Sequence, residues 1–258
     1  MGERGGRSAV LARAEGHARV TRDTALVRVA NVTTGDRVIV LAGGGIETAA
    51  LIPALLGAGA VVTPLRVRCG FGWERHESAA LRRCCARLAR PNLQPIVEVE
   101  YGLADVLASH WGITGRGIPT STDDPALLEI PLRNITLLTA AATHFRDAPE
   151  LVMATGTTSD NHFGDGSRAF FDASETLLSM ATQMRVRVLT PFIEMSKTQV
   201  IQQADLAVLA ASWSCIDPDG DQQCGRCIKC GRRRAAFLTA GVIDPTRYAA
   251  GDDLQGGP

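Results

Sequence analysis

Residues 37–48 read RVIVLAGGGIET, and this stretch decides the fold class. Val38 to Ala42 form a continuous apolar run, which is typical of a parallel strand buried on both faces. Three glycines, Gly43 to Gly45, end the run, and a helical stretch starts at about Ile46. A buried strand, a glycine turn and a helix in this order are typical of an α/β protein.

The same alternation of strand and helix continues to about residue 190. Apolar runs predict four more strands, at 60–65, 95–99, 151–155 and 186–189. Charged and apolar residues at helical spacing predict helices at 74–90, 133–145 and 171–184. This order predicts a doubly wound parallel sheet. Two connections exceed the usual loop length, and we expect an active-site lid in them: 102–132 and 156–170.

We expect four segments along the chain. Residues 1–36 are an extension rich in Arg, Gly and Thr, partly ordered, with one apolar alternation that fits a small hairpin. Residues 37–212 form the α/β domain. Residues 213–242 form a zinc-binding segment and a helix, and residues 243–258 a flexible tail.

Composition narrows the class of protein. Lys and Arg together number 27, as do Asp and Glu, so net charge gives no argument for nucleic acid or an anionic membrane as a partner. The start, MGERGGRSAV, has no apolar core of a secretory signal. The longest uncharged stretch, 48–65, contains two prolines and two glycines, so we predict no membrane helix. We expect a cytoplasmic protein.

Four of the seven cysteines predict a metal site. Cys215, Cys224, Cys227 and Cys230 have the spacing C-x8-C-x2-C-x2-C, and four thiolates close a tetrahedron around Zn²⁺ with no position left for water. We therefore predict one structural zinc per chain, with an iron–sulfur cluster as the alternative. The other cysteines are predicted to be free thiols without a part in chemistry: Cys69, Cys84 and Cys85.

The glycine loop predicts an anion site. Glycines between a strand and a helix let backbone N–H groups face a phosphate, and the helix N-terminus adds the positive end of its dipole. The spacing matches neither the Rossmann nor the Walker motif. A plain strand–helix turn is the alternative.

Five segments, in order along the chain, resemble motifs of one enzyme family. They are Gly43 to Thr48 against S-G-G-x-D-S, Arg75-His76, Arg133-Asn134, Thr190 to Lys197 against T-P-L-x-x-x-x-K, and Trp213 to Cys230 against W-S-C…C-G-x-C-x-x-C. From about residue 37 to 241 the chain resembles the 7-cyano-7-deazaguanine synthase family of the PP-loop ATP pyrophosphatase superfamily. The resemblance implies that 37–212 is a nucleotide-binding domain.

The resemblance also implies a reaction, in queuosine biosynthesis. ATP, with Mg²⁺, activates the carboxylate of 7-carboxy-7-deazaguanine as an acyl-adenylate. Ammonia displaces AMP to give an amide, and a second ATP supports dehydration to the nitrile. The resemblance implies that the protein binds small molecules and does not bind nucleic acid directly. A homodimer is expected only because family members often form one.

Site residues follow from the same motifs. By resemblance, Lys197 and Arg133 are the catalytic cations. ATP is expected on the loop and on the head of the helix that starts at 133, with these residues: Leu41, Ala42, Gly43, Gly44, Gly45, Ile46, Glu47, Thr48 and Asn134. Arg75, His76 and Asp160 are expected at the substrate. The alternative for each charged residue is a solvated helix end or cap, and for His76 a structural hydrogen bond.

The loop departs from the family pattern. Gly43 stands in place of the first Ser, Glu47 in place of Asp, and Thr48 in place of the last Ser, while Pro53 is expected to kink the following helix. These changes keep two alternatives open. One is a relative that stops at the amide or joins deazaguanine to another amine, such as a protein N-terminus. The other is a non-catalytic nucleotide- or base-binding protein.

Overall fold

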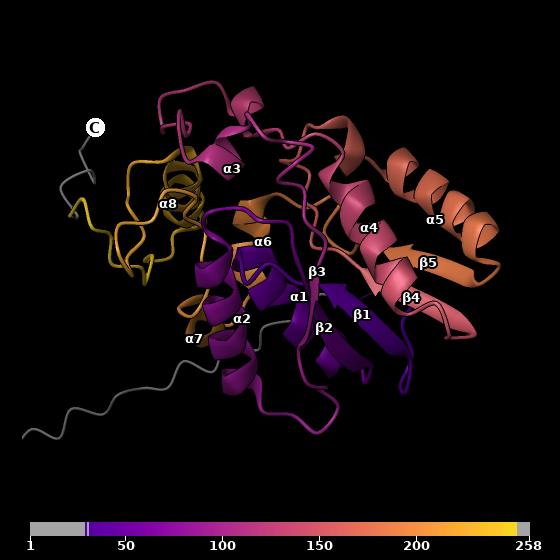
Figure 1. Ribbon diagram of the computed structural model, residues 1–258. Coiled ribbons are helices and arrows are strands. Elements are labelled where there is room, and N and C mark those ends of the chain that lie inside the picture. The colour runs from indigo at the N-terminus through magenta and orange to yellow at the C-terminus, as the bar shows by residue number, and fades with distance from the viewer. Residues whose placement is uncertain (1–28, 30, 252–258) are drawn as a thin grey trace, which may run out of the picture.

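The computed structural model of the protein describes residues 29 and 31–251 (Figure 1). The hairpin predicted within residues 1–36 and the end of the predicted tail lie outside the described residues. The start of that tail is anchored. Tyr248 donates a 2.6 Å hydrogen bond from its hydroxyl to Asp244, and Asp244 pairs with the buried Arg233 at 3.1 Å.

Five parallel strands form one sheet, with the order β3-β2-β1-β4-β5. The strands are β1 (Arg37–Leu41), β2 (Val61–Arg68), β3 (Val97–Glu100), β4 (Glu150–Ala154) and β5 (Arg185–Leu189). The chain runs from β1 outward to β3 and then returns to the other side of β1 with β4. The sheet therefore has its topological switch point between β1 and β4, where open α/β sheets form ligand-binding crevices.

Helices cover both faces of this sheet (Figure 1). They are α1 (Ile46–Gly57), α2 (Glu74–Leu88), α3 (Trp111–Thr114), α4 (Arg133–His144), α5 (Arg168–Thr182), α6 (Lys197–Gln203), α7 (Leu206–Leu209) and α8 (Ile228–Ala240), with 3-10 turns η1 (Pro125–Leu128) and η2 (Gly164–Gly166). The predicted doubly wound sheet is thus confirmed.

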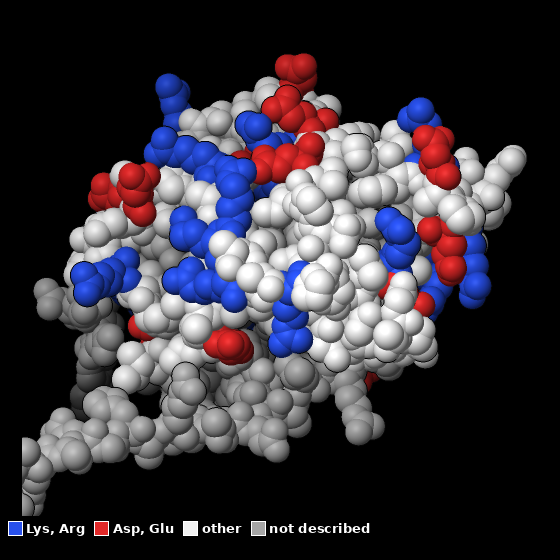
Figure 2. Space-filling model, turned by 90° about the horizontal axis from the view of Figure 1, so that it is seen from below, with Lys and Arg blue, Asp and Glu red and all other residues white. Residues whose placement is uncertain are grey.

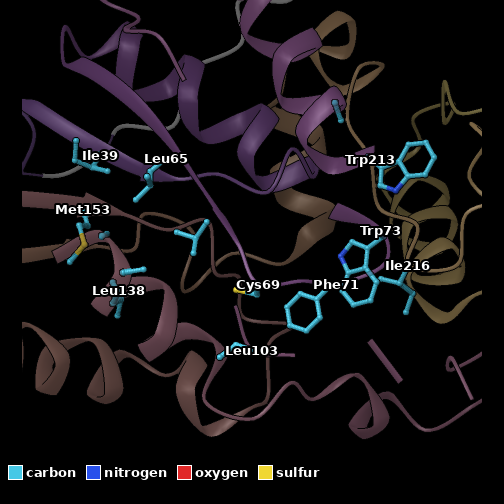
Figure 3. Packing of buried hydrophobic residues seen from close by; sticks show 14 of the residues in the cluster. Ile39, Leu65, Cys69, Phe71, Trp73, Leu103, Leu138, Met153, Trp213 and Ile216 are labelled. Carbon is cyan, nitrogen blue, oxygen red and sulfur yellow. The ribbon is translucent and has the colours of Figure 1, made fainter. Parts of the chain in front are cut away.

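Two apolar cores lie on opposite faces of the sheet, because side chains alternate along each strand. Val38 and Val40 of β1 pack in the core beneath α1, α2, α6 and α7. Ile39, between them, packs in the other core with Leu138 of α4 and with α5. Figure 3 shows this second core, which continues from Ile39 toward the aromatic side chains at one end of the sheet.

Strand β2 runs three residues beyond the end predicted at Leu65. Pro64 has no N–H to donate to a neighbouring strand. In the structure Pro64 pairs with Val40 of β1, and pairing with β3 begins only at Leu65. The extension carries Arg66 into the sheet. Helix α1 continues through Pro53 to Gly57.

The surface charge is unevenly distributed although the net charge is zero. Figure 2 shows Lys and Arg side chains gathered over part of the face seen there. Within the described chain, no helix combines the length and the apolar character needed to cross a membrane.

Candidate functional site

A cavity of about 290 Å³ lies at the carboxyl ends of the central strands. Leu41 and Ala42 from the end of β1 line it, together with Leu65 from β2 and Thr155 just after β4. The cavity is therefore at the switch point of the sheet, where the glycine loop follows β1.

The glycine loop has one position where only glycine fits. Gly44 has φ +70°, and a Cβ there would lie 2.5 Å from the carbonyl oxygen of Glu77 in α2. Two hydrogen bonds hold the loop: the Gly43 N–H donates to the Thr48 hydroxyl at 3.2 Å, and the Trp213 N–H donates to the Gly44 carbonyl at 2.9 Å. The loop is thus held both by α1, which carries Thr48, and by the four-cysteine segment, which starts at Trp213.

Glu47 and Lys197 meet in the cavity as an ion pair. Both side chains are mostly buried, and a Cβ on Gly156 would lie 2.6 Å from the Cβ of Glu47, so Gly156 leaves room for the pair. Burial raises the pKa of Glu47, but the nearby Lys197 and Lys229 outweigh it and bring the pKa to about 2. Glu47 is therefore an anion, and it partly neutralises the positive charge of Lys197.

Arg133 and Asn134 open α4 at the cavity wall. Asn134 is held by Asp165, whose carboxylate accepts the Asn134 backbone N–H at 2.9 Å and whose carbonyl accepts the side-chain amide at 2.7 Å. The buried Nε of Arg133 has no hydrogen-bond partner among the described residues. Arg133 is thus available to a ligand, whereas Asn134 is already engaged.

Asp160 also lies at the cavity, and it is engaged with two neighbours. Its carboxylate accepts the backbone N–H of Lys197, the first residue of α6, and its carbonyl accepts a hydrogen bond from Arg232 at 3.0 Å. Asp160 therefore connects the loop after β4 with α6 and α8.

The other predicted substrate pair lies elsewhere. His76 is buried against Trp213, with ring centroids 4.6 Å apart, and its Nε2 donates to the Gly220 carbonyl at 2.9 Å. Arg75 is exposed. Neither lines the cavity, because the face of α2 turned toward it carries Glu74 and Glu77, one helical turn apart. His76 thus makes the structural contact that was the alternative for it.

Several cavity residues were not predicted from the sequence. Arg66, 3% exposed, pairs with Glu77 at 2.7 Å and lies 3.8 Å from Glu74. Glu74 in turn accepts backbone N–H groups of the turn after β2, at 2.7 and 3.0 Å. The segment LRVRC, residues 65–69, alternates apolar residues with two arginines, and of these two only Arg66 is buried. Lys229 of α8 and Arg232 also line the cavity.

One wall of the cavity is aromatic. All three tryptophans of the chain, Trp73, Trp111 and Trp213, line it. Trp73 stacks between Phe71 and Trp111, with ring centroids 5.0 and 5.4 Å apart, and Figure 3 shows Phe71 and Trp73 beside Ile216. Trp111 belongs to the long connection 102–132, so that connection forms part of the wall; its closure as a lid remains a prediction.

The four predicted metal ligands come together. The sulfur atoms of Cys215, Cys224, Cys227 and Cys230 lie within 4.8 Å of one another, and all four residues are buried. Cys215 and Cys227 have their sulfurs 3.9 Å apart, near the ~3.8 Å that a tetrahedron with zinc–sulfur bonds of ~2.3 Å requires. The donor set and its spacing fit one tetrahedral metal ion.

Backbone groups support these sulfurs. The N–H of Cys224 points to the Cys215 sulfur at 3.3 Å, and those of Arg226 and Cys227 point to the Cys224 sulfur at 3.4 and 3.3 Å. Such donors stabilise the negative charge of thiolates. Cys227 also pairs with Thr120, so the cluster is joined to the connection 102–132, which lies beside α8 in Figure 1.

We expect the double variant Cys84→Ala, Cys85→Ala to keep its ligand binding and turnover. Both residues are free thiols on α2, and burial raises the pKa of each to about 11, so neither is a nucleophile near neutral pH. Removing the buried Cys84 sulfur should cost about 1 kcal/mol of stability. Urea unfolding and a steady-state assay measure the two effects. A large loss of turnover with intact folding would contradict the assignment.

Comparison with known proteins shows the family of the chain. The family described as queuosine biosynthesis protein QueC matches residues 37–241. The 7-cyano-7-deazaguanine synthase 1 of Sphingopyxis alaskensis is 29% identical over 84% of this chain and 100% of that protein. The 7-cyano-7-deazaguanine synthase of Cupriavidus necator is 30% identical over 83% of this chain and 98% of that protein. The chain therefore belongs to the QueC family.

Proposed function

We propose that the protein is an ATP-dependent carbon–nitrogen ligase that converts 7-carboxy-7-deazaguanine with ammonia to the amide and then to 7-cyano-7-deazaguanine. The observation that carries this proposal is the composition of one cavity. A glycine loop and unpaired cations lie in the same space as an aromatic wall. The glycine loop and the cations can bind phosphates, and the aromatic wall can stack on planar bases.

The chemistry assigned to the cavity has three steps. A carboxylate oxygen of the substrate attacks the α-phosphorus of ATP and pyrophosphate leaves. Ammonia then attacks the acyl carbon, AMP leaves, and an amide forms. In the third step the amide oxygen attacks the α-phosphorus of a second ATP and pyrophosphate leaves; the C–O bond then breaks, AMP carries the oxygen away, and the nitrogen loses its two protons as the nitrile forms.

The protein's share in these steps is positioning and charge. Gly43 to Thr48 hold the phosphates through backbone N–H groups, and Mg²⁺ accompanies the nucleotide. Arg133 and Lys197 stabilise the negative charge that develops on phosphate. We assign no substrate contact to Arg75 or His76, which lie outside the cavity wall. Asp160 holds Lys197 and Arg232 in place at the cavity through its hydrogen bonds to them.

We also propose that the four clustered cysteines hold one structural Zn²⁺. A closed shell of thiolates supplies rigidity and no activated water. The metal site is connected to the glycine loop, because Trp213, two residues before Cys215, donates its N–H to the Gly44 carbonyl. The metal ion therefore helps to hold the loop at the cavity.

Product analysis tests the proposed reaction. The protein is incubated with 7-carboxy-7-deazaguanine, Mg–ATP and ammonium, and products are identified by mass spectrometry. Nitrile supports the full reaction. Amide alone, or a conjugate with a supplied amine or peptide N-terminus, supports the divergent relative that the altered loop motivates. Absence of AMP and of any new product, with ATP or base still bound, supports the non-catalytic alternative.

Restoring the family's loop residues, Gly43→Ser with Glu47→Asp, is expected to raise ATP affinity about tenfold, the value of one hydrogen bond to a charged group. A Cβ at 43 would lie 3.7 Å from Arg66, so serine fits. Aspartate is shorter by one methylene than glutamate, so Lys197 is freer to bind a phosphate. Isothermal titration measures the change, and Gly43→Ala, which fills the space without a hydroxyl, is the control. An affinity no higher than that of the natural chain would contradict this expectation.

A further inference from the structure

The cations of the cavity differ in whether a carboxylate neutralises them. Arg66 pairs with Glu77, and Arg233 with Asp244 outside the cavity wall. Lys197 pairs with Glu47. Within residues 31–251, no carboxylate lies within ion-pair distance of the three other cations, which are Arg133, Lys229 and Arg232. Positive charge at the cavity is therefore in excess at these three places.

Arg232 donates to the Asp160 carbonyl, whereas Arg133 and Lys229 have neither a salt bridge nor a side-chain hydrogen bond in the described chain. Arg133 already has a proposed role at the reacting phosphate, so Lys229 is the unpaired cation that still lacks one. Lys229 lies in the first turn of α8, between the clustered Cys227 and Cys230. Lys229 is half-buried and lines the same cavity as Glu47, and its charge helps to lower the pKa of that carboxyl. A partly buried, unpaired ammonium is costly unless a ligand supplies the counter-charge.

We infer that Lys229 donates a charged hydrogen bond to a phosphate group of ATP, and so adds a cation that no carboxylate among residues 31–251 neutralises. This inference rests on the proposed binding of ATP in the cavity. Glu47, one methylene longer than the family's Asp, neutralises part of the charge of Lys197. The positive charge of Lys229 compensates for this loss. The metal site thereby has a second role, since the two cysteines that flank Lys229 fix where its side chain starts.

Neutral substitution of Lys229 separates this role from a structural one. We expect Lys229→Gln to weaken Mg–ATP binding ten- to a hundredfold by isothermal titration, the range for a lost hydrogen bond to a charged group. Lys229→Arg, which keeps the charge, should restore most of the affinity. Arg226→Gln is the matched control, because Arg226 lies in the same cysteine segment but is exposed and pairs with Asp217 and Asp219 outside the cavity.

Metal content and thermal unfolding of each variant show whether the segment is intact. If Lys229→Gln loses metal, Lys229→Met, which keeps the length of the apolar stem, takes its place. Wild-type affinity in a folded, metal-loaded Lys229→Gln overturns the inference and leaves the proposed function standing. Loss of metal in both neutral variants also overturns it, because Lys229 would then support the fold. A natural chain that binds no ATP defeats the proposed function itself.

Discussion

Cys227→Ser is expected to release the metal ion and to cost several kcal/mol of stability, because binding of a structural metal contributes directly to folding. Cys227 is buried in the four-sulfur cluster and also pairs with Thr120 of the long connection. Its loss should therefore loosen α8 and the connection together. Metal analysis gives the zinc content, and thermal unfolding with and without a chelator gives the stability.

Cys85→Ser is the control for this substitution, since Cys85 is a free thiol on α2 away from the cluster. It should keep one zinc per chain and respond to chelator as the natural protein does. A natural protein without zinc, or one with the absorbance of an iron–sulfur cluster, would contradict the zinc assignment. Unchanged stability of Cys227→Ser would contradict the structural role.

The loss of metal should also disturb the glycine loop. The Trp213 N–H that holds the Gly44 carbonyl comes from the same segment as Cys215, and Trp213 stacks on the buried His76. When the cluster opens, these two contacts lose their support. We therefore expect the metal-free protein to bind ATP more weakly than the metal-loaded one under identical conditions.

Local sequence features predicted most of the fold. Val38 to Ala42 and the later apolar stretches identified all five strands of the described sheet to within three residues. The central strand β1 is continuously apolar because it is buried on both faces, whereas the edge strands β3 and β5 alternate apolar and charged residues. The spacing of the cysteines predicted the cluster because all four lie within sixteen residues of chain. Helices α6 and α7, of seven and four residues, carry too few turns to show a period.

The cavity was harder to predict because its ion pairs join different elements of the fold. Arg66 on β2 and Glu77 on α2 form a buried ion pair that no spacing rule reports. Lys229 is a spacer residue between two cysteines of the metal motif, which predicts no role for it, although its side chain lines the cavity. Arg75 and His76 matched a motif in order, but the helix period turns them away from the ligand space. A motif gives the element, and only packing gives the direction of each side chain.

Gly44→Ala is expected to weaken ATP binding more than a hundredfold, as would follow from losing about 3 kcal/mol of charged backbone hydrogen bonding to phosphate. Gly44 has φ +70°, where a side chain costs about 1–2 kcal/mol. The new Cβ would also lie 2.5 Å from the Glu77 carbonyl oxygen and 2.9 Å from the Leu81 nitrogen. Both are backbone atoms of α2 that cannot rotate away, so the loop must shift instead.

Gly43→Ala isolates this backbone effect from the mere addition of a methyl group. Its φ is not in the left-handed region, and its nearest neighbours would be side-chain atoms of Arg66 and Glu77 at 3.7 and 3.9 Å, which is ordinary contact. We expect it to bind ATP almost as the natural chain does. Titration of both variants, with urea unfolding to show that each is folded, decides the matter. If folded Gly44→Ala binds ATP normally, the loop does not cradle the phosphates through its backbone, and the ligase proposal loses the contact on which its first step depends.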